Sequence, residues 1–250
     1  MGETAVNPVL DLMRRHRSVR RYAPTPLPRA LLEEAVSAAQ MASTASHTQT
    51  YCVLRITDTA ARERLAELCG NQRMVAEAGA FLVVCGDIRR HRLLSDRAGR
   101  PHVQNLESFL TAAVDAALFG QNLALALEAR GLGICYVGGL RNRLAEVGAL
   151  LELPRGVLPF FGLCAGEPAE IPGRKPRLPL AAVLLDDRYP ADEEVLAALD
   201  AFDATMADHY AGRGLEGRSW SDGIVRMHEA ARRGYLPAYY REQGADLGPG

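Results

Sequence analysis

The segment from residue 106 to residue 129 constrains the fold of this chain more than any other. It is apolar on nearly every side of a helix, and at about 1.5 Å per residue such a helix extends roughly 35 Å. Asp115, Gln121 and Asn122 interrupt its most apolar part, which favours a buried helix over a membrane span. We therefore expect this helix to lie at the centre of the fold or against a partner subunit.

Composition places the chain among ordinary globular proteins. It has 250 residues, of which 48% are hydrophobic and 24% charged. At this length roughly 70 to 75% of the unfolded surface is buried on folding, so a core needs no metal or disulfide. The net charge of −1 gives no general preference for nucleic acid or an acidic membrane. The five cysteines are scattered, mostly in apolar runs and without a CxxC motif, which together with the lack of a signal peptide predicts a cytoplasmic protein.

Hydrophobic periodicity predicts an α+β fold in a single domain over residues 1–250. Residues 90–104 lack periodicity and are predicted to form a loop, as are residues 167–180. The tail from residue 220 is basic and aromatic and shows little core of its own. The pattern predicts further helices at residues 6–15, 31–42, 60–68 and 193–210, and strands at residues 51–57, 80–85, 134–137 and 158–166.

Residues 16–21 (His-Arg-Ser-Val-Arg-Arg) combine three guanidinium groups, a hydroxyl and an imidazole. Arginine offers paired donors and a fixed charge, so this segment suits a phosphate-bearing ligand. A solvated or nucleic-acid-facing surface is the alternative for such a cluster taken alone. A second basic pair, Lys175 and Arg177, favours the ligand interpretation. Between them, Gly138 and Gly139 permit close approach to a flat ligand, or simply form a strand-to-helix turn.

Motifs for catalysis by the protein's own side chains are missing from the sequence. His228-Glu229 lacks the second histidine of a zinc-protease helix, so no metal site is predicted. The Gly-Leu-Gly of residues 131–133 follows a helix and lacks the third glycine of a dinucleotide-binding loop. We therefore expect the chemistry to belong to a bound cofactor.

Several motifs together resemble one family. The chain is similar, from about residue 9 to residue 236, to the oxygen-insensitive NADPH nitroreductases and NADPH–flavin oxidoreductases, in the branch of the major bacterial nitroreductase. The segments that carry the resemblance, in order, are residues 16–20, the loop that ends at Gln49, residues 55–58, 70–72, 131–142, 158–164 and 175–179.

The resemblance implies a nitroreductase-like α+β fold with a central mixed or antiparallel sheet, and an intertwined homodimer that binds FMN at its interface. Residues 190–250 are then a C-terminal extension that packs on the partner. Arg20 and Lys175 are expected to stabilise the charge of reduced flavin. Ala45 and His47 depart from the family's serine-rich loop, which puts one hydrogen bond in doubt. The flavin contacts implied by the resemblance are His16, Arg17, Ser18, Arg20, Ser43, Thr44, Ala45, Gln49, Gln72, Tyr136, Val137, Gly138, Gly139, Lys175 and Arg177.

The activity implied is ping-pong transfer of hydride from NADPH through FMN to nitroaromatics, quinones or related acceptors. Arg213, with Arg218 assisting, matches the family's contact to the 2′-phosphate of NADPH. A flavin reductase that supplies reduced FMN is a related alternative, and a flavin-binding regulatory protein without turnover is an alternative of another class. A nucleic-acid module fits the net charge poorly, and neither nucleic acid nor membrane is expected as a partner.

Overall fold

A computed structural model describes residues 7–245 and 247–248. The chain divides into two compact units, which are described separately. The first contains the residues up to Pro172 together with those from Arg233 onward, and the second spans Gly173–Arg232.

The first unit is built on a four-stranded sheet in the order β1-β2-β4-β3, in which all neighbouring strands are antiparallel. The strands are β1 (Tyr51–Ile56), β2 (Ala80–Asp87), β3 (Gly133–Val137) and β4 (Val157–Gly166). Every residue of β2 is buried, because helices cover both faces of the sheet. The predicted α+β fold with an antiparallel sheet is confirmed.

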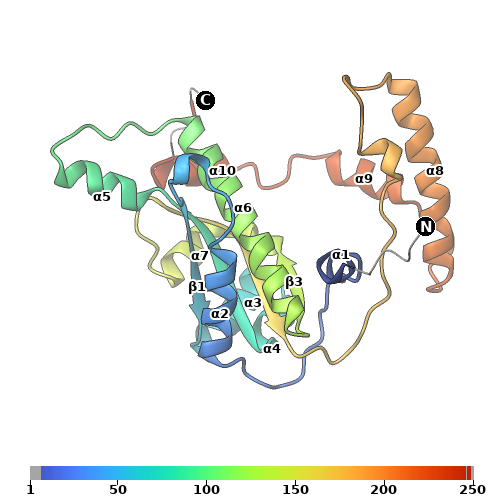
Figure 1. The fold of residues 1–250 in the computed structure, drawn as a ribbon, viewed down its shortest axis with the longest axis horizontal. Helices are drawn as coiled ribbons and strands as arrows, with labels where there is room; N and C mark the ends of the chain where they lie inside the picture. Colours follow the sequence, from blue (N-terminus) through green and yellow to red (C-terminus); the bar gives the residue numbers. More distant parts are fainter. Residues whose placement is uncertain (1–6, 246, 249–250) are drawn as a thin grey trace. The chain divides into compact units, whose positions relative to one another are not determined.

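Helices α2 (Arg29–Ala39) and α6 (Leu106–Ala129) lie side by side on one face of the sheet (Figure 1). The other face is covered by α3 (Thr59–Leu68), α4 (Met74–Glu77) and α7 (Leu144–Leu150). Two hydrophobic clusters therefore sandwich the sheet, one on each face.

Helix α6 has the bounds that the sequence predicts. Asn105 caps it, with a reciprocal bond to Ser108. Within the described residues it is the one helix long and apolar enough to cross a membrane, but its buried face packs on α2 and the sheet as a core helix. A stripe of large apolar residues on α6 is nevertheless exposed at helical spacing: Leu106, Leu110, Val114 and Leu118.

The remaining elements of the first unit are short. They are α1 (Pro8–Arg14), α5 (Arg89–Arg97) and α10 (Leu236–Glu242), with 3₁₀ turns η1 (Ala45–His47) and η2 (Gly138–Asn142). The predicted loop over residues 90–104 is wrong across its first half, which is α5. This helix buries none of its residues, so it has no apolar stripe for periodicity to detect.

The tail from residue 220 contributes to the core of the first unit through its last helix. On α10, Tyr239 and Tyr240 are buried in the first unit, and Tyr240 Oη donates to the carbonyl of Pro159 at 2.9 Å. Phe109 packs edge-on against Tyr240 with ring centroids 5.2 Å apart. These partners are distant in the sequence, so the local hydrophobic pattern around α10 does not predict the contacts.

The second unit consists of η3 (Leu180–Ala182), α8 (Asp192–Ala211) and α9 (Trp220–His228). The carboxylate of Asp203 on α8 accepts bonds from the backbone N–H groups of Trp220 and Ser221, at 2.8 and 3.0 Å. Phe202 and Trp220 pack edge to face at 5.1 Å. These contacts hold α9 on α8.

Candidate functional site

The basic segment predicted to bind phosphate lies along the free edge of β3. Val19 N–H donates to the carbonyl of Ile134 at 2.9 Å, and Ser18 forms a bridge with the same residue. Tyr22 Oη donates to the carbonyl of Val19 at 2.7 Å. At Gly133 an added Cβ would meet the Val19 side chain at 2.7 Å, so the glycine permits this close pairing. The backbone of residues 16–20 is therefore fixed to the strand that leads to the glycine pair.

His16 is held by Glu128 near the end of α6. Its Nδ1 lies 2.7 Å from Glu128 Oε1, and the Glu128 side chain is only 10% exposed. A carboxylate only accepts, so Nδ1 donates, and Nε2 remains available to a second partner. The carboxylate thereby sets the orientation of the imidazole.

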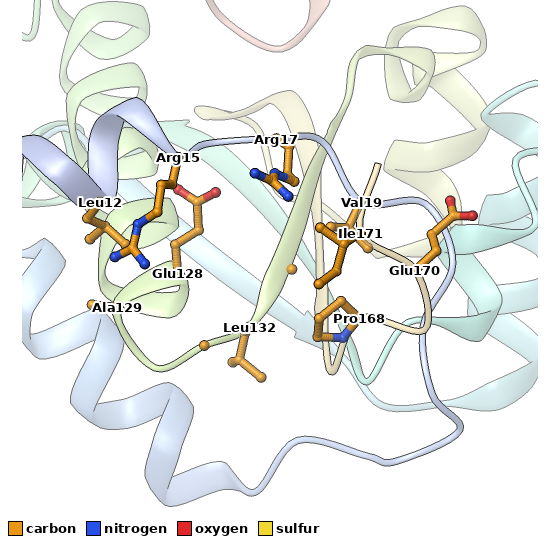
Figure 2. Close-up of a pocket in the computed structure, with 12 residues that line it drawn as sticks. Leu12, Arg15, Arg17, Val19, Glu128, Ala129, Leu132, Pro168, Glu170 and Ile171 are labelled. Carbon is orange, nitrogen blue, oxygen red and sulfur yellow. The ribbon is translucent and has the colours of Figure 1, made fainter. Parts of the chain in front are cut away.

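A cavity of about 380 Å³ lies beside this segment. Figure 2 shows Arg15 and Glu128 on one side of it, Pro168 and Glu170 on the other, and the Arg17 side chain between them. Arg17 Nε is buried, and the described residues supply it with no hydrogen-bond partner. A buried guanidinium N–H without an acceptor costs free energy, so this atom suits an anionic ligand oxygen. The Arg17 guanidinium is thus a candidate partner for a phosphate.

The other end of β3 carries the residues predicted to contact the flavin ring. An added Cβ at Gly139 would overlap the Cys69 carbonyl and the Gln72 side-chain amide, whereas one at Gly138 would meet only the Arg141 side chain, at 3.4 Å. Gln72 Nε2 donates to the Cys69 carbonyl at 2.8 Å. The structure therefore brings Gln72 against the glycine pair, as the predicted site requires.

Tyr136 turns its side chain toward α6, where its hydroxyl donates to the carbonyl of Gly120 at 2.9 Å. Burial, with a smaller contribution from the charge of Glu128, raises the pKa of Tyr136 from 10.0 to about 12. The phenol stays neutral at physiological pH. Tyr136 is partly exposed, whereas Val137 is fully buried.

The loop of residues 43–50, also predicted to contact flavin, is organised by a buried carboxylate. Asp115, which is 0% exposed on α6, accepts from Ala45 N and Thr50 N at 3.1 Å each and from Thr50 Oγ1 at 2.7 Å. Within this loop Ser46, His47 and Gln49 have positive φ angles of 48°, 57° and 51°. Such angles are unfavourable for these residue types, so surrounding contacts must hold them.

Asp115 is the functional residue that sequence reasoning missed. In the sequence it is only a polar interruption of an apolar helix. A buried acid in such a helix needs partners, and this is the one signal that pointed to it.

The middle and the C-terminal end of α6 hold the two groups of predicted flavin contacts. Asp115 binds the loop of residues 43–50, and Glu128 binds His16 thirteen residues further along the helix. At about 1.5 Å per residue, the two anchoring points are roughly 20 Å apart.

The pairing of the strands also separates the loop of residues 43–50 from the basic segment. Ile134, which forms the bridge with Ser18, lies in a row of paired residues that crosses the sheet from strand to strand. This row reaches β2 at Ala80, the first residue of that strand. Tyr51, directly after the loop, pairs with Gly86 near the end of β2, and β1 and β3 form opposite edges. One copy of the chain therefore places Ser43, Thr44, Ala45 and Gln49 at the corner of the sheet diagonally opposite the basic segment.

The second unit contains a cavity of about 690 Å³ lined by four cations. Lys175 and Arg177, predicted for the flavin phosphate, line it together with Arg213 and Arg218, predicted for NADPH. The Arg218 guanidinium lies 5.0 Å from the centroid of the Tyr210 ring, also in the wall. The cavity therefore suits an anionic group beside an aromatic one.

Among the described residues, no group of three or more histidine, cysteine or acidic side chains could hold a metal ion. His209 also lines the cavity of the second unit. Its Nε2 is buried and finds no acceptor or donor in the described part of the chain. Nothing in the local sequence pattern singled out this residue.

An antiparallel sheet between two helical layers, edged by a basic segment and a glycine pair, places the chain in a known class. The Nitroreductase family model matches residues 13–166, and the model of the Nitroreductase family C-terminal domain matches residues 175–248. The chain belongs to the nitroreductase family.

Individual relatives agree over almost the whole length. An oxygen-insensitive NADPH nitroreductase of Salmonella typhimurium is 40% identical over 242 residues, covering 96% of this chain and 98% of the relative. An FMN reductase (NADPH) of Bacillus subtilis is 37% identical over 246 residues, with 96% and 98% covered. Among solved structures, an NADPH:FMN oxidoreductase from Vibrio harveyi in complex with NAD⁺ is 32% identical with a TM-score of 0.87, covering 96% of this chain and 99% of that one.

Proposed function

We propose that this chain is an FMN-dependent oxidoreductase that takes hydride from NADPH and reduces nitroaromatics, quinones or related acceptors. The names of the relatives support the cofactor and the cosubstrate. The observation that carries the proposal is the arrangement around β3, where the basic segment lies beside the strand and a glycine pair packed on Gln72 follows it. Bound FMN would supply the redox chemistry, accepting hydride from NADPH and passing two electrons to the acceptor.

The residues of the first unit then hold and orient the cofactor. His16, Arg17 and Ser18 bind the phosphate end, with Glu128 fixing the imidazole and Arg17 Nε free to donate. The backbone of residues 136–139 supports the ring, with Gln72 beside it. Arg20 stabilises negative charge on the reduced ring. Lys175 and Arg177 belong to the second unit; we propose the same role for Lys175 and a phosphate contact for Arg177.

We propose further that the active species is a homodimer with the cofactor between its subunits. In one copy the loop of residues 43–50 is anchored at the middle of α6 and the basic segment at its C-terminal end, roughly 20 Å apart. A second copy can bring its own loop to the basic segment of the first. The exposed apolar stripe of α6 supports this assembly, since such a surface is normally covered.

The same proposal assigns a role to residues 190–232. Because α10 packs in the core of the first unit of its own chain, only the preceding part of residues 190–250 remains as an arm for the partner. We place the enzyme in the cytoplasm, where its reduced thiols persist.

The proposal predicts that the purified protein is yellow and that its colour bleaches when NADPH is added without oxygen. Nitrofurazone or a benzoquinone then restores the colour at a rate that supports turnover. Bound flavin that NADPH does not reduce would instead identify a flavin-binding protein without turnover. Comparing kcat/KM for free FMN with that for the nitro compound distinguishes the flavin reductase alternative.

Charge reversal at Arg213 tests the nucleotide site. Arg213→Glu removes charge-assisted bonds worth about 1.5–3 kcal/mol, so the KM for NADPH rises roughly 10- to 100-fold. The KM for NADH, which lacks the 2′-phosphate, stays near its original value. Arg226→Glu on the exposed side of α9 is the matched control and leaves both constants unchanged. An equal loss of affinity for both nucleotides would contradict the assignment of Arg213.

A further inference from the structure

The strands of the sheet set four of the five cysteines in two directly opposed pairs. Cys52 on β1 faces Cys85 on β2, and Cys135 on β3 faces Cys164 on β4. Both pairs belong to the hydrophobic layer beneath α3 and α4. The two pairs are equivalent in their cross-strand placement, so differences between them arise from their surroundings.

Access differs between the pairs. Cys52 is half-buried on an edge strand, whereas Cys135 and Cys164 are 2% and 0% exposed. A small oxidant in solvent reaches the partly exposed Cys52 more readily than either cysteine of the buried pair.

The first pair also favours a thiolate. A hydrogen bond from the Cys85 thiol lowers the pKa of Cys52, and Arg90 acts in the same direction, against burial and the charge of Asp87. The same bond and burial raise the pKa of Cys85 well above its ordinary value, so the shared proton stays there. Burial raises the pKa of Cys164, and it raises that of the fifth cysteine, Cys69, to about 12.

The backbone permits a disulfide between Cys52 and Cys85. Asp87 N–H donates to the carbonyl of Thr50 at 3.0 Å, which makes Thr50–Asp87 a hydrogen-bonded pair of the ladder. Hydrogen-bonded pairs recur every second residue, so Cys52–Cys85 is another, with Cα atoms about 5.5 Å apart. Disulfides span Cα distances of roughly 4.4–6.8 Å. A register shift between Val84 and Cys85 also gives β2 local freedom to adjust.

We propose that Cys52 and Cys85 form a dithiol site, separate from the flavin site, that hydrogen peroxide oxidises to a disulfide. The Cys52 thiolate attacks one peroxide oxygen, forming an S–O bond as the O–O bond breaks and hydroxide leaves. Cys85 then attacks the Cys52 sulfur, forming the S–S bond as the S–O bond breaks. The second hydroxide and the thiol protons give water, so two thiols lose two electrons and one peroxide yields two waters.

The experiment treats the full-length, cofactor-loaded protein with stoichiometric peroxide, blocks the remaining thiols and maps tryptic peptides without reduction. Cleavage after lysine and arginine puts each cysteine in its own peptide, so each pairing has a distinct mass. The expected product links the peptide of residues 30–55 to that of residues 74–89, less two hydrogens. Cys135→Ser leaves this product intact, and Cys52→Ser abolishes it. With Cys85→Ser, Cys52 stops at a sulfenic acid that dimedone traps.

A second measurement needs no variant. In the reduced wild-type protein, iodoacetamide should modify Cys52 roughly tenfold or more faster than Cys135. Equal rates at these two residues, or peroxide linkage of residues 131–141 to residues 156–174 before the proposed product, would overturn the proposal.

Discussion

Replacing Asp115 with alanine is expected to lower the free energy of unfolding by about 3–5 kcal/mol and to abolish stable flavin binding. The carboxylate accepts bonds from two backbone N–H groups and one hydroxyl inside the core. Each buried donor left without an acceptor costs about 1–3 kcal/mol. The positive φ angles of Ser46, His47 and Gln49 add strain that is released when the loop comes free.

Urea denaturation followed by circular dichroism measures the stability, and flavin absorbance per protomer measures binding. Asp115→Asn keeps one side-chain oxygen as an acceptor, so we expect a smaller loss, about 1–2 kcal/mol. Asp200→Ala, on an exposed position of α8, is the matched control and should change stability by less than about 0.5 kcal/mol. If Asp115→Ala behaved like Asp200→Ala, the proposed anchoring of the loop would be wrong.

Gly139→Ala is expected to destabilise the protein by about 2–3 kcal/mol, because an extra methyl group there forces the packed backbone apart. The added carbon would overlap the Cys69 carbonyl and the Gln72 amide, and the carbonyl belongs to backbone that cannot rotate away. The displaced Gln72 no longer lies beside the glycine pair, so flavin content falls as well.

The adjacent glycine provides the control. An added Cβ at Gly138 meets nothing closer than the Arg141 side chain at 3.4 Å. Gly138→Ala should therefore leave the free energy of unfolding nearly unchanged, and comparison of the two urea transitions tests the difference. Equal stability of the two variants would mean that Gly139 is not held against Cys69 and Gln72 in solution.

The sequence predicted the elements that carry their own hydrophobic pattern. The apolar run of residues 106–129 became α6 with the same bounds, and the continuous apolar run at residues 80–85 became the buried strand β2. It did not predict α5, whose residues are all at least partly exposed, or the burial of Tyr239 and Tyr240. The formation of this helix and the burial of these tyrosines depend on helix contacts or on partners distant in the sequence. A local hydrophobic pattern does not contain that information.

The sequence likewise predicted some features of the candidate site and not others. Residue chemistry alone selected the basic segment at residues 16–21, because guanidinium groups at that density suit a phosphate. Family resemblance selected Gln72, and the structure places it against Gly139. The sequence did not indicate that the loop of residues 43–50 lies some thirteen residues along α6 from that segment, since this depends on which residues of α6 each one meets.

By itself, then, the sequence determined the α+β class, the central helix and the ligand chemistry, because periodicity and residue type are local properties of the chain. Only the tertiary structure decided that Asp115 anchors one loop, that Glu128 orients His16 and that Cys52 faces Cys85. Those relations depend on strand register and on helix packing between residues tens of positions apart. Small differences in packing energy set both, and no single segment contains that information.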